Sequence, residues 1–588
     1  MCGIFGYKGR RNASPIVIEG LKKLDYRGYD SWGIGIAHED VIHIKKDAGR
    51  IEVSREMPDL EKLPGTAGIA HTRWATHGHV TKENANPHSS NNGKIAVVHN
   101  GIIENFQEQK QFLAGQGFKF YSETDTETIP NTIEYHMRRG YDFIEAAKRS
   151  LKHLEGQYAI LALDSEGKIV AVRKEAPLVV GVGKDEYFLA SDVTAFIDHT
   201  KDVIFLEEND MVIIDGGLKI FNLDKNAFVK RPVSKIDWDA EQAKKGNFDH
   251  FYLKEIMEQA EVIERISNTD QKIIKEIAGE IRKAKGVYIV ACGTASYASM
   301  YGLYLFSKIA KTHVNSCVAS EFQYFKHFLN SKSLVIAVSQ SGETADTLSA
   351  IRAAKSMGAK VVSITNVNGS SLMRESDKSI LQKAGPEIAV NSTKAYTSQL
   401  AILGLLAYEL SGKLGEGTEE LKELSREIYY LTSENARKFV KELAEKLKDK
   451  EHIYLIGRGP QYPTALEAAH KIKEVSYIHA EAFAGGELKH GPNALITKGT
   501  PYIVFSSGET EKETINSAME VKARGAFVVG VGPKNNEVFD FFIKVRDAGD
   551  FNSIVQIIPM QILSYQLALL RGCDPDRPRN LAKSVTVK

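Results

Sequence analysis

The sequence has few cysteines, almost no net charge and no apolar run of the length we expect for a membrane span. Its 588 residues include four cysteines, Cys2, Cys292, Cys317 and Cys573, which lie far apart and form no CxxC pair. This spacing argues against a disulfide framework and against a structural zinc site. The formal net charge is +1, so no charge excess favours nucleic acid or an anionic membrane. We therefore expect no metal, no nucleic acid and no membrane partner.

The first residues, MCGIFGYKGR, lack the charged region and the longer apolar core of a signal peptide. We therefore expect a cytoplasmic protein. The chain is 43% hydrophobic and 26% charged, which is ordinary for a globular protein. At 588 residues it is too long for one hydrophobic core, and about three domains are expected.

Two regions of the chain differ in pattern. Residues 2–225 contain short β-branched runs broken by turns, with helical stretches near 14–24, 103–116, 127–139 and 143–154. This pattern predicts an α+β domain of layered sheets and helices. The polar, charged stretch 226–250 has no clear apolar period, and we interpret it as an interdomain linker.

An internal repeat follows the linker. VYIVACGT (287–294) matches IYLIGRGP (453–460), and SGET (341–344) recurs as SGET (507–510) at the same spacing. Strands alternate with helices in both copies, which predicts mostly parallel sheets covered by helices on both faces. We place the copies at 251–425 and 426–578, with a tail at 579–588.

The position of Cys2 allows two interpretations. It is either a small hydrophobe at the start of a buried strand or, if Met1 is removed, a nucleophile beside its own α-amine. An α-amine has a pKa near 8 and can accept the thiol proton at neutral pH.

Hydroxyl-rich loops follow two strands of the first copy. They read ACGTAS (291–296) and SQSGETADT (339–347), and each leads into a helix. Backbone amides at a helix N-terminus and short hydroxyls form an anion site, although Ser and Thr are also common N-caps. The second copy has fewer hydroxyls in GRGPQ and SSGET, so we expect phosphate only in the first copy.

Taken together, these motifs resemble the glutamine–fructose-6-phosphate aminotransferases, also called glucosamine-6-phosphate synthases, along essentially the whole chain. The motifs that carry the resemblance, in order, are CGIFGY, YRGYDS, HTRWATHG, VHNGIIEN, SETDTE, SQSGETADT, STKAYT, HAEAFAGGELKHGP and LAKSVTVK. The resemblance implies an α/β multidomain fold. An N-terminal-nucleophile α+β sandwich is followed by two doubly wound α/β sugar isomerase (SIS) domains and a catalytic tail.

The resemblance also implies the activity. Glutamine and fructose 6-phosphate would give glutamate and glucosamine 6-phosphate, the first step of the hexosamine pathway, without a cofactor and in a homodimer. Ammonia released at the first domain would pass to the sugar.

In the first domain the resemblance makes Cys2 the nucleophile and Asn100 and Gly101 the oxyanion donors. An Asn-Gly pair alone would more often be a turn. HTRWATHGHV contains His71, His77 and His79, and an HxH pair can bind metal, but no Asp/Glu–His cluster completes such a site. The glutamine-binding residues implied by the resemblance are Arg73, Trp74, Thr76, His77 and Asp125, with Arg27 nearby in a role that the sequence does not define.

In the SIS region the resemblance makes Glu474 the carboxylate that moves a proton between two sugar carbons, with Lys471 beside it. The i, i+3 spacing of Lys471 and Glu474 alone would favour a solvated ion pair. His490 would open the sugar ring from the neighbouring subunit, and Lys583 would form an imine with the ketone. The phosphate-binding residues implied are Thr294, Ser339, Gln340, Ser341 and Thr344. The chain departs from the family's usual CGTS by having Ala295, followed by Ser296.

Other functions fit less well. Amination of a different phosphosugar stays open, but a phosphoribosyl-pyrophosphate amidotransferase would need a phosphoribosyl domain in place of the repeat. SIS domains also occur in transcription regulators, which would carry a helix-turn-helix and a basic face, and neither is evident here.

Overall fold

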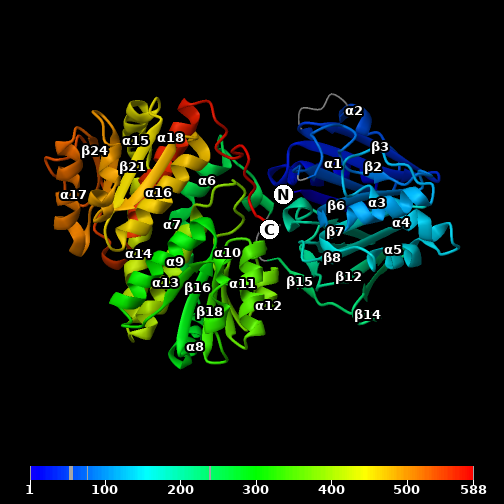
Figure 1. Cartoon of the computed structure of the whole chain (residues 1–588), viewed down its shortest axis with the longest axis horizontal. Helices are drawn as coiled ribbons and strands as arrows, with labels where there is room; N and C mark the ends of the chain where they lie inside the picture. Colours follow the sequence, from blue (N-terminus) through cyan, green and yellow to red (C-terminus); the bar gives the residue numbers. More distant parts are fainter. Residues whose placement is uncertain (1, 52–56, 76, 237–239, 587–588) are drawn as a thin grey trace. The chain divides into compact units, whose positions relative to one another are not determined.

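The computed structural model describes residues 2–51, 57–75, 77–236 and 240–586, and it divides into two compact units. The first unit comprises the chain through Lys244 together with the residues from Ala582 onward. The second comprises Lys245–Leu581. Each unit has its own sheets and its own hydrophobic core (Figure 1).

The first unit contains two antiparallel sheets, of eight and seven strands among the described residues. The strand order of the first sheet is β15 (Val233–Lys235), β11 (Asp202–Phe205), β9 (Val179–Gly183), β10 (Glu186–Ala190), β1 (Gly3–Lys8), β4 (Ala67–Arg73), β2 (Ser31–His38) and β3 (Val41–Ala48). The order of the second is β14 (Ala227–Val229), β13 (Leu218–Asn222), β12 (Asp210–Ile214), β8 (Ile169–Lys174), β7 (Gly156–Asp164), β6 (Ile95–Ile103) and β5 (His88–Ser89).

The two sheets of the first unit face each other across a shared core. Ile4 and Ile69 of the first sheet lie in the same buried cluster as Val98 and Leu161 of the second. Alternate residues of each strand point to opposite faces, so the remaining apolar side chains need cover on the outside. The helices of this unit, most of which supply that cover, are α1 (Ala13–Lys23), α2 (Met57–Leu60), α3 (Phe106–Gly115), α4 (Thr128–Met137) and α5 (Phe143–Leu151). The predicted α+β sandwich is confirmed.

The predicted helices of this unit are present; the first is displaced by one residue, and the other three are slightly shorter than the sequence pattern suggests. The helix expected from residue 103 begins at Phe106, because β6 continues through Ile103. The segment predicted as a linker contains the edge strands β14 and β15. The domain boundaries themselves stay predictions.

Two parallel five-stranded sheets form the second unit, counted over the described residues. The strand order of the first sheet is β17 (Asn315–Val318), β16 (Gly286–Ala291), β18 (Ser333–Ser339), β19 (Lys360–Thr365) and β20 (Lys378–Leu381). The order of the second is β22 (His479–Ala484), β21 (His452–Gly457), β23 (Pro501–Phe505), β24 (Phe527–Gly532) and β25 (Phe541–Lys544). Numbered within each copy, both sheets have the order 2-1-3-4-5 of a doubly wound fold. The two doubly wound α/β domains implied by the resemblance are confirmed.

The helices of the second unit connect and cover these strands. They are α6 (Phe251–Met257), α7 (Gln259–Ser267), α8 (Gln271–Lys283), α9 (Gly293–Lys308), α10 (Ala319–Phe322), α11 (Ala345–Ser356), α12 (Ser371–Glu375), α13 (Lys394–Leu410), α14 (Leu414–Leu431), α15 (Glu434–Leu447), α16 (Gln461–Ser476), α17 (Glu511–Ala523) and α18 (Asn552–Leu570). One buried cluster includes side chains of both sheets, such as Ile289 and Ile503, so the two copies share a core.

One segment is more apolar than the sequence analysis allowed. Gly549–Leu570 is long and apolar enough to cross a membrane by length and composition, so the expectation that no run reaches this length is wrong. However, 83% of its most apolar window is buried inside the protein. The segment is therefore buried as a core helix of the second unit.

The first copy has its topological switch point between β16 and β18. These neighbouring parallel strands lead into α9 and α11. Side chains of α9 pack with Ile289 and Ile336, whereas those of α11 pack with Val290 and Ala337, so the helices cover opposite faces. Ligands of doubly wound proteins bind in the crevice that this divergence opens at the carboxyl ends of the strands. ACGTAS and SQSGET lie at these two strand ends.

Candidate active sites

Cys2 lies directly before β1, opposite the end of β4. β1 and β4 pair with Gly3 against Thr72, which brings Cys2 beside Trp74. The Trp74 N–H donates to Cys2 Sγ at 3.2 Å. Burial raises the pKa of the Cys2 thiol, so the thiol is protonated near neutral pH and a base must remove its proton before it can attack.

Two side chains hold the backbone of Cys2. The Asn100 Nδ2 on β6 donates to the Cys2 carbonyl oxygen at 3.0 Å, and Arg27 Nε donates to the same oxygen at 3.4 Å. Arg27 in turn lies 3.5 Å from the Asp192 carboxylate. The structure thus gives Arg27 a role that the sequence did not define: it fixes the residue that carries the thiol.

Gly101, next to Asn100, must be glycine. Its φ is +118°, and a Cβ at this position would lie 2.0 Å from the carbonyl oxygen of Gln157 on β7. A side chain would force β6 and β7 apart directly beside Asn100. The Asn-Gly pair therefore lies at a close strand contact, within β6 instead of in a hairpin turn.

We predict that Gly101→Ala lowers glutamine hydrolysis by at least about 10-fold, because the clash displaces Asn100 and positive φ itself costs about 1–3 kcal/mol. Gly140→Ala is the matched control, since Gly140 has φ +92° with open space around its Cβ position. Glutaminase kinetics and thermal unfolding check the pair. Equal effects of the two substitutions would contradict a specific role for the β6–β7 contact.

Two other predicted glutamine-binding residues, Arg73 and Asp125, have defined hydrogen-bond partners near the ends of β4 and β6. Arg73 ends β4, and its guanidinium donates to the carbonyl oxygens of His77, Gly78 and His79, the last two at 3.1 Å. Asp125 is buried, and its carboxylate accepts the Ile103 N–H at 2.8 Å at the end of β6. Thr76 lies outside the described residues.

The sequence analysis missed two groups that shape this site. Asp30 accepts the Ala75 N–H at 2.8 Å and so holds the chain after Trp74. His71 is buried on β4 with Nε2 at 2.9 Å from the His99 carbonyl oxygen, and burial lowers its pKa to about 3. His71 is therefore neutral at physiological pH. Both residues belong to motifs quoted in the sequence analysis, Asp30 to YRGYDS and His71 to HTRWATHG, but neither motif indicated these roles.

The SQSGET loop gathers three hydroxyls at the start of α11. Ser339 Oγ accepts the Gly342 N–H at 3.1 Å and lies 3.1 Å from Thr344 Oγ1, and Ser341 Oγ accepts the Glu343 N–H at 3.1 Å. Thr344 occupies the N-cap position, yet within the described chain its hydroxyl does not cap the helix. This geometry favours an anion site over simple capping.

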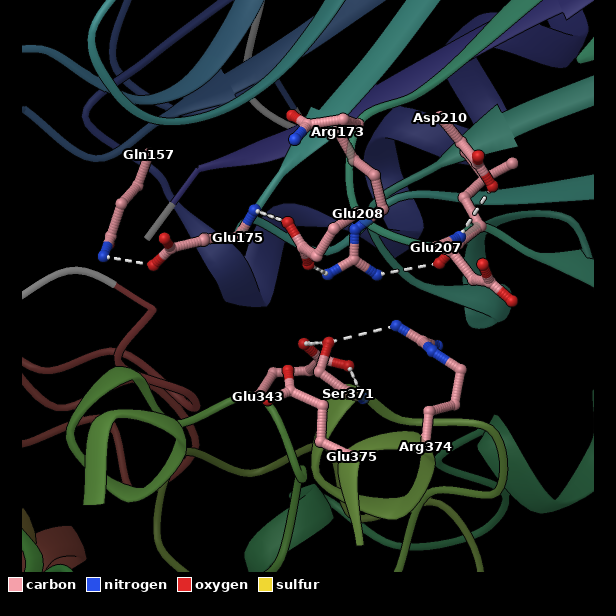
Figure 2. A network of polar contacts seen from close by, with 12 residues as sticks. Gln157, Arg173, Glu175, Glu207, Glu208, Asp210, Glu343, Ser371, Arg374 and Glu375 are labelled. Atoms are coloured by element: carbon pink, nitrogen blue, oxygen red, sulfur yellow. Dashed lines mark hydrogen bonds and ion pairs between the residues drawn. The ribbon is translucent and has the colours of Figure 1, made fainter. Parts of the chain in front are cut away.

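The loop is anchored to the next helix by Glu343. Its two carboxylate oxygens accept the Ser371 N–H and the Ser371 hydroxyl, both at 2.7 Å, and Arg374 Nη2 donates to the same hydroxyl at 3.1 Å (Figure 2). Gly342 has φ +67°, and a Cβ there would lie 2.2 Å from Ser370 Oγ. The backbone around the hydroxyls is therefore tightly fixed.

Thr294, at the start of α9, connects the first loop to α16. Its hydroxyl donates to Glu467 Oε1 at 3.3 Å and accepts from Lys471 Nζ at 3.0 Å. Ala295 supplies no hydroxyl, and the Ser296 hydroxyl donates back to the Gly293 carbonyl oxygen at 2.6 Å. In this structure Ser296 is directed to its own helix.

The helix α16 carries a buried row of charges. Lys471 Nζ lies 2.8 Å from Glu474 Oε2 and 3.5 Å from Glu467 Oε1, and Lys471 and Glu467 are completely buried. Although burial alone would lower it, the two carboxylates raise the pKa of Lys471 above its ordinary value. Lys471 therefore stays protonated and is a poor candidate for an imine.

The two carboxylates of this row differ in pKa. Burial raises the pKa of Glu467 to about 7, whereas Lys471 and His470 outweigh burial and lower the pKa of Glu474 to about 2. Two carboxylates with separated pKa values are typical of acid–base sites. The sequence analysis missed Glu467, although its i, i+4 spacing from Lys471 could have indicated it.

The remaining predicted residues lie on other segments. His490 is exposed at the end of the 3-10 helix Glu487–His490, and Lys583 belongs to the first unit. The start of the tail is tied to the second unit. The Asp576 carboxylate accepts the N–H groups of Phe251 and Tyr252 at 2.9 and 2.7 Å, and Arg579 lies over the Tyr477 ring.

Among the described residues, no group of three or more His, Cys, Asp or Glu side chains is arranged to hold a metal ion.

Comparison with known proteins defines the class. Residues 71–198 match the glutamine amidotransferase domain model, and residues 280–408 and 446–540 match the SIS domain model. The C-terminal domain of glucosamine-fructose-6-phosphate aminotransferase from Francisella tularensis superposes with a TM-score of 0.53 at 36% identity, covering 57% of this chain and 99% of that chain. The chain is therefore a glutamine amidotransferase joined to tandem SIS domains.

Relatives that match over the full length of both chains define the family. Proteins named glutamine–fructose-6-phosphate aminotransferase (isomerizing) from Methanothermobacter thermautotrophicus, Thermococcus kodakarensis and Clostridium tetani are 47%, 44% and 43% identical to it. The chain belongs to the family of isomerizing glutamine–fructose-6-phosphate aminotransferases.

Proposed function

We propose that this protein transfers the amide nitrogen of glutamine to fructose 6-phosphate, forming glucosamine 6-phosphate and glutamate. The observation that carries the proposal is the likeness to enzymes of this name along the whole of both chains. The constrained thiol at Cys2 and the buried charges of α16 support it, because the reaction needs a nucleophile in one domain and acid–base groups in the other.

In the first unit, Cys2 is the nucleophile. Once Met1 is removed, the α-amine of Cys2 takes the thiol proton, and the sulfur attacks the side-chain amide carbon of glutamine. The C–N bond breaks, ammonia leaves, and water hydrolyses the thioester to glutamate. Asn100 Nδ2 uses one hydrogen on the Cys2 carbonyl, and its second hydrogen, with the Gly101 N–H, binds the oxyanion.

Two charged side chains of the first unit select glutamine by its α-carboxylate and its α-ammonium group. Arg73 offers a planar fork to the α-carboxylate of glutamine, and Asp125 offers a carboxylate to the α-ammonium. Trp74 and His77 shape the pocket, and Thr76 is assigned to it by the resemblance alone.

In the second unit, the hydroxyls of Ser339, Ser341 and Thr344 bind the phosphate, together with Thr294 and Gln340. Lys583 of the tail forms an imine with the C2 ketone of the open-chain sugar and releases water. Ammonia then adds to C2 and displaces the Lys583 amine, which leaves an unsubstituted imine at C2. Glu474 removes a proton from C1 and returns it to C2, which converts this ketimine into the 2-amino aldose. Lys471 keeps Glu474 in place, and Lys583, not Lys471, carries the imine.

We place the enzyme in the cytoplasm as a homodimer, in which His490 acts in the site of a second copy and opens the sugar ring. The test of the function is incubation of the purified protein with glutamine and fructose 6-phosphate. Glucosamine 6-phosphate should form only when both are present, and its absence under these conditions would disprove the proposal.

The double substitution Ser341→Ala/Thr344→Ala should raise the KM for fructose 6-phosphate by at least about 100-fold. Each charge-assisted hydrogen bond to phosphate contributes about 1.5–3 kcal/mol, and tenfold in affinity corresponds to about 1.4 kcal/mol. The repeat provides the control: Ser507→Ala/Thr510→Ala changes the same motif of the second copy and should leave this KM within about threefold. Glutamine hydrolysis without sugar should persist in both variants. If the first variant loses glutamine hydrolysis as strongly as it loses activity on fructose 6-phosphate, misfolding is indicated instead of a phosphate site.

A further inference from the structure

His470 lies one helical turn before Glu474 on the same face of α16. Its Nε2 lies 3.2 Å from Glu474 Oε1, and their side chains are 26% and 16% exposed. A carboxylate only accepts hydrogen bonds, so a stabilising contact here needs a proton on Nε2. His470 therefore lies within ion-pairing distance of the carboxylate to which proton transfer is assigned.

The two oxygens of Glu474 have different partners. Lys471 contacts Oε2 at 2.8 Å, and His470 contacts Oε1. Lys471 is shared, because its ammonium also reaches Thr294 and Glu467. Within the described residues, His470 and Lys471 are thus the two basic side chains paired with this carboxylate, and both favour its ionised form.

The imidazole is itself held against the first SIS copy. Its ring meets the ring of Tyr297 on α9 edge to face, with centroids 5.6 Å apart. A Cβ at Gly293 would lie 3.8 Å from His470 Nε2, so the imidazole nitrogen lies beside the ACGTAS loop. His470 therefore bridges the loop at the switch point and the helix that carries Glu474.

We propose that His470 is a positioning residue for the sugar isomerisation: its Nε2–H holds Glu474 ionised and aimed during the transfer of a proton from C1 to C2. This inference rests on the proposed role of Glu474. The C1–H bond breaks as Oε1 or Oε2 takes the proton, and the same proton forms the new C2–H bond, so His470 itself neither gains nor loses an atom.

Two substitutions separate this role from simple packing. His470→Leu removes the donor, whereas His470→Gln places an amide N–H near the position of Nε2. Isomerisation of fructose 6-phosphate to glucose 6-phosphate without glutamine, and exchange of the substrate C1 hydrogen in deuterium oxide, both report on Glu474. We expect His470→Leu to lower kcat and the exchange rate by about 10- to 100-fold, with the KM within about threefold.

His470→Gln should recover both rates to within about threefold of wild type. Lys473→Leu is the matched control on the solvent-exposed side of α16 and should change neither rate. Thermal unfolding of all variants checks that the helix is intact.

Three results would overturn the inference: wild-type rates in His470→Leu, equal loss in the Leu and Gln variants, or a change confined to the KM. Glu474→Gln distinguishes failure of the underlying role. If Glu474→Gln still exchanges the C1 hydrogen, the proposed function of Glu474 is wrong. If it does not and His470→Leu is normal, only the role of His470 is wrong.

Discussion

Replacement of Cys2 by alanine is expected to reduce release of glutamate from glutamine by on the order of 10⁴-fold or more, as removal of a covalent nucleophile does elsewhere. The physical reason is specific to this site. Cys2 supplies the attacking sulfur. Asn100 and Arg27 fix the Cys2 backbone directly before the start of β1 and opposite the end of β4. Isomerisation of fructose 6-phosphate should be retained, because Cys2 has no assigned part in it.

Cys317→Ala is the matched control for this variant. Cys317 is also a free, half-buried thiol, but it lies on β17. It should leave both activities within about twofold of wild type. The intact mass of active enzyme adds a second readout, since the mature chain should lack Met1 and begin at Cys2. Fully active protein that retains Met1 would disprove the α-amine mechanism, and equal loss of isomerisation in Cys2→Ala would indicate a folding defect.

Replacement of Lys583 by arginine is expected to have the second large effect on synthesis of glucosamine 6-phosphate. The guanidinium keeps the positive charge but cannot form an imine, so synthesis of glucosamine 6-phosphate should fall by about 10³-fold or more, equivalent to about 4 kcal/mol of transition-state stabilisation. Hydrolysis of glutamine at Cys2 should continue.

Contacts within the second unit fix the start of the tail. Asp576 binds the start of α6, and the Arg579 backbone N–H donates to the Tyr477 hydroxyl at 2.8 Å, directly after α16. The tail is therefore anchored up to Arg579, four residues before Lys583 in the sequence.

Borohydride trapping identifies the lysine directly. Reduction in the presence of fructose 6-phosphate should leave a stable adduct on the peptide that contains Lys583, and Lys473→Arg should trap normally. An adduct on Lys471, or normal synthesis by Lys583→Arg, would contradict the assignment. The raised pKa of Lys471 makes the first of these outcomes chemically unfavourable.

The sequence predicted those features that depend on local pattern. Strand and helix patterns indicated the sandwich, self-similarity indicated the repeat, and the alternation of strands with helices indicated parallel sheets. The 2-1-3-4-5 strand order became evident only in the structure. The hydroxyl loops were found because a parallel sheet brings the carboxyl ends of β16 and β18 to one edge. Family motifs added Cys2, Glu474 and Lys583, which spacing alone could not identify.

Features that depend on distant contacts were not predictable in this way. The link from Thr294 to Glu467 and Lys471 exists because α9 and α16, equivalent helices of the two copies, pack together. Arg27 acquires its role only where the turn after α1 meets the Cys2 carbonyl. His470 was overlooked because a histidine within an amphipathic helix carries no signal until its partner is seen.

The most direct test of the central claim follows the nitrogen. Purified protein is supplied with fructose 6-phosphate and glutamine labelled with ¹⁵N in the side-chain amide, without added ammonium salt, and both products are quantified. The account predicts one glutamate for each glucosamine 6-phosphate, with ¹⁵N in the amino group of the sugar. Glutamate formed without labelled amino sugar would contradict it.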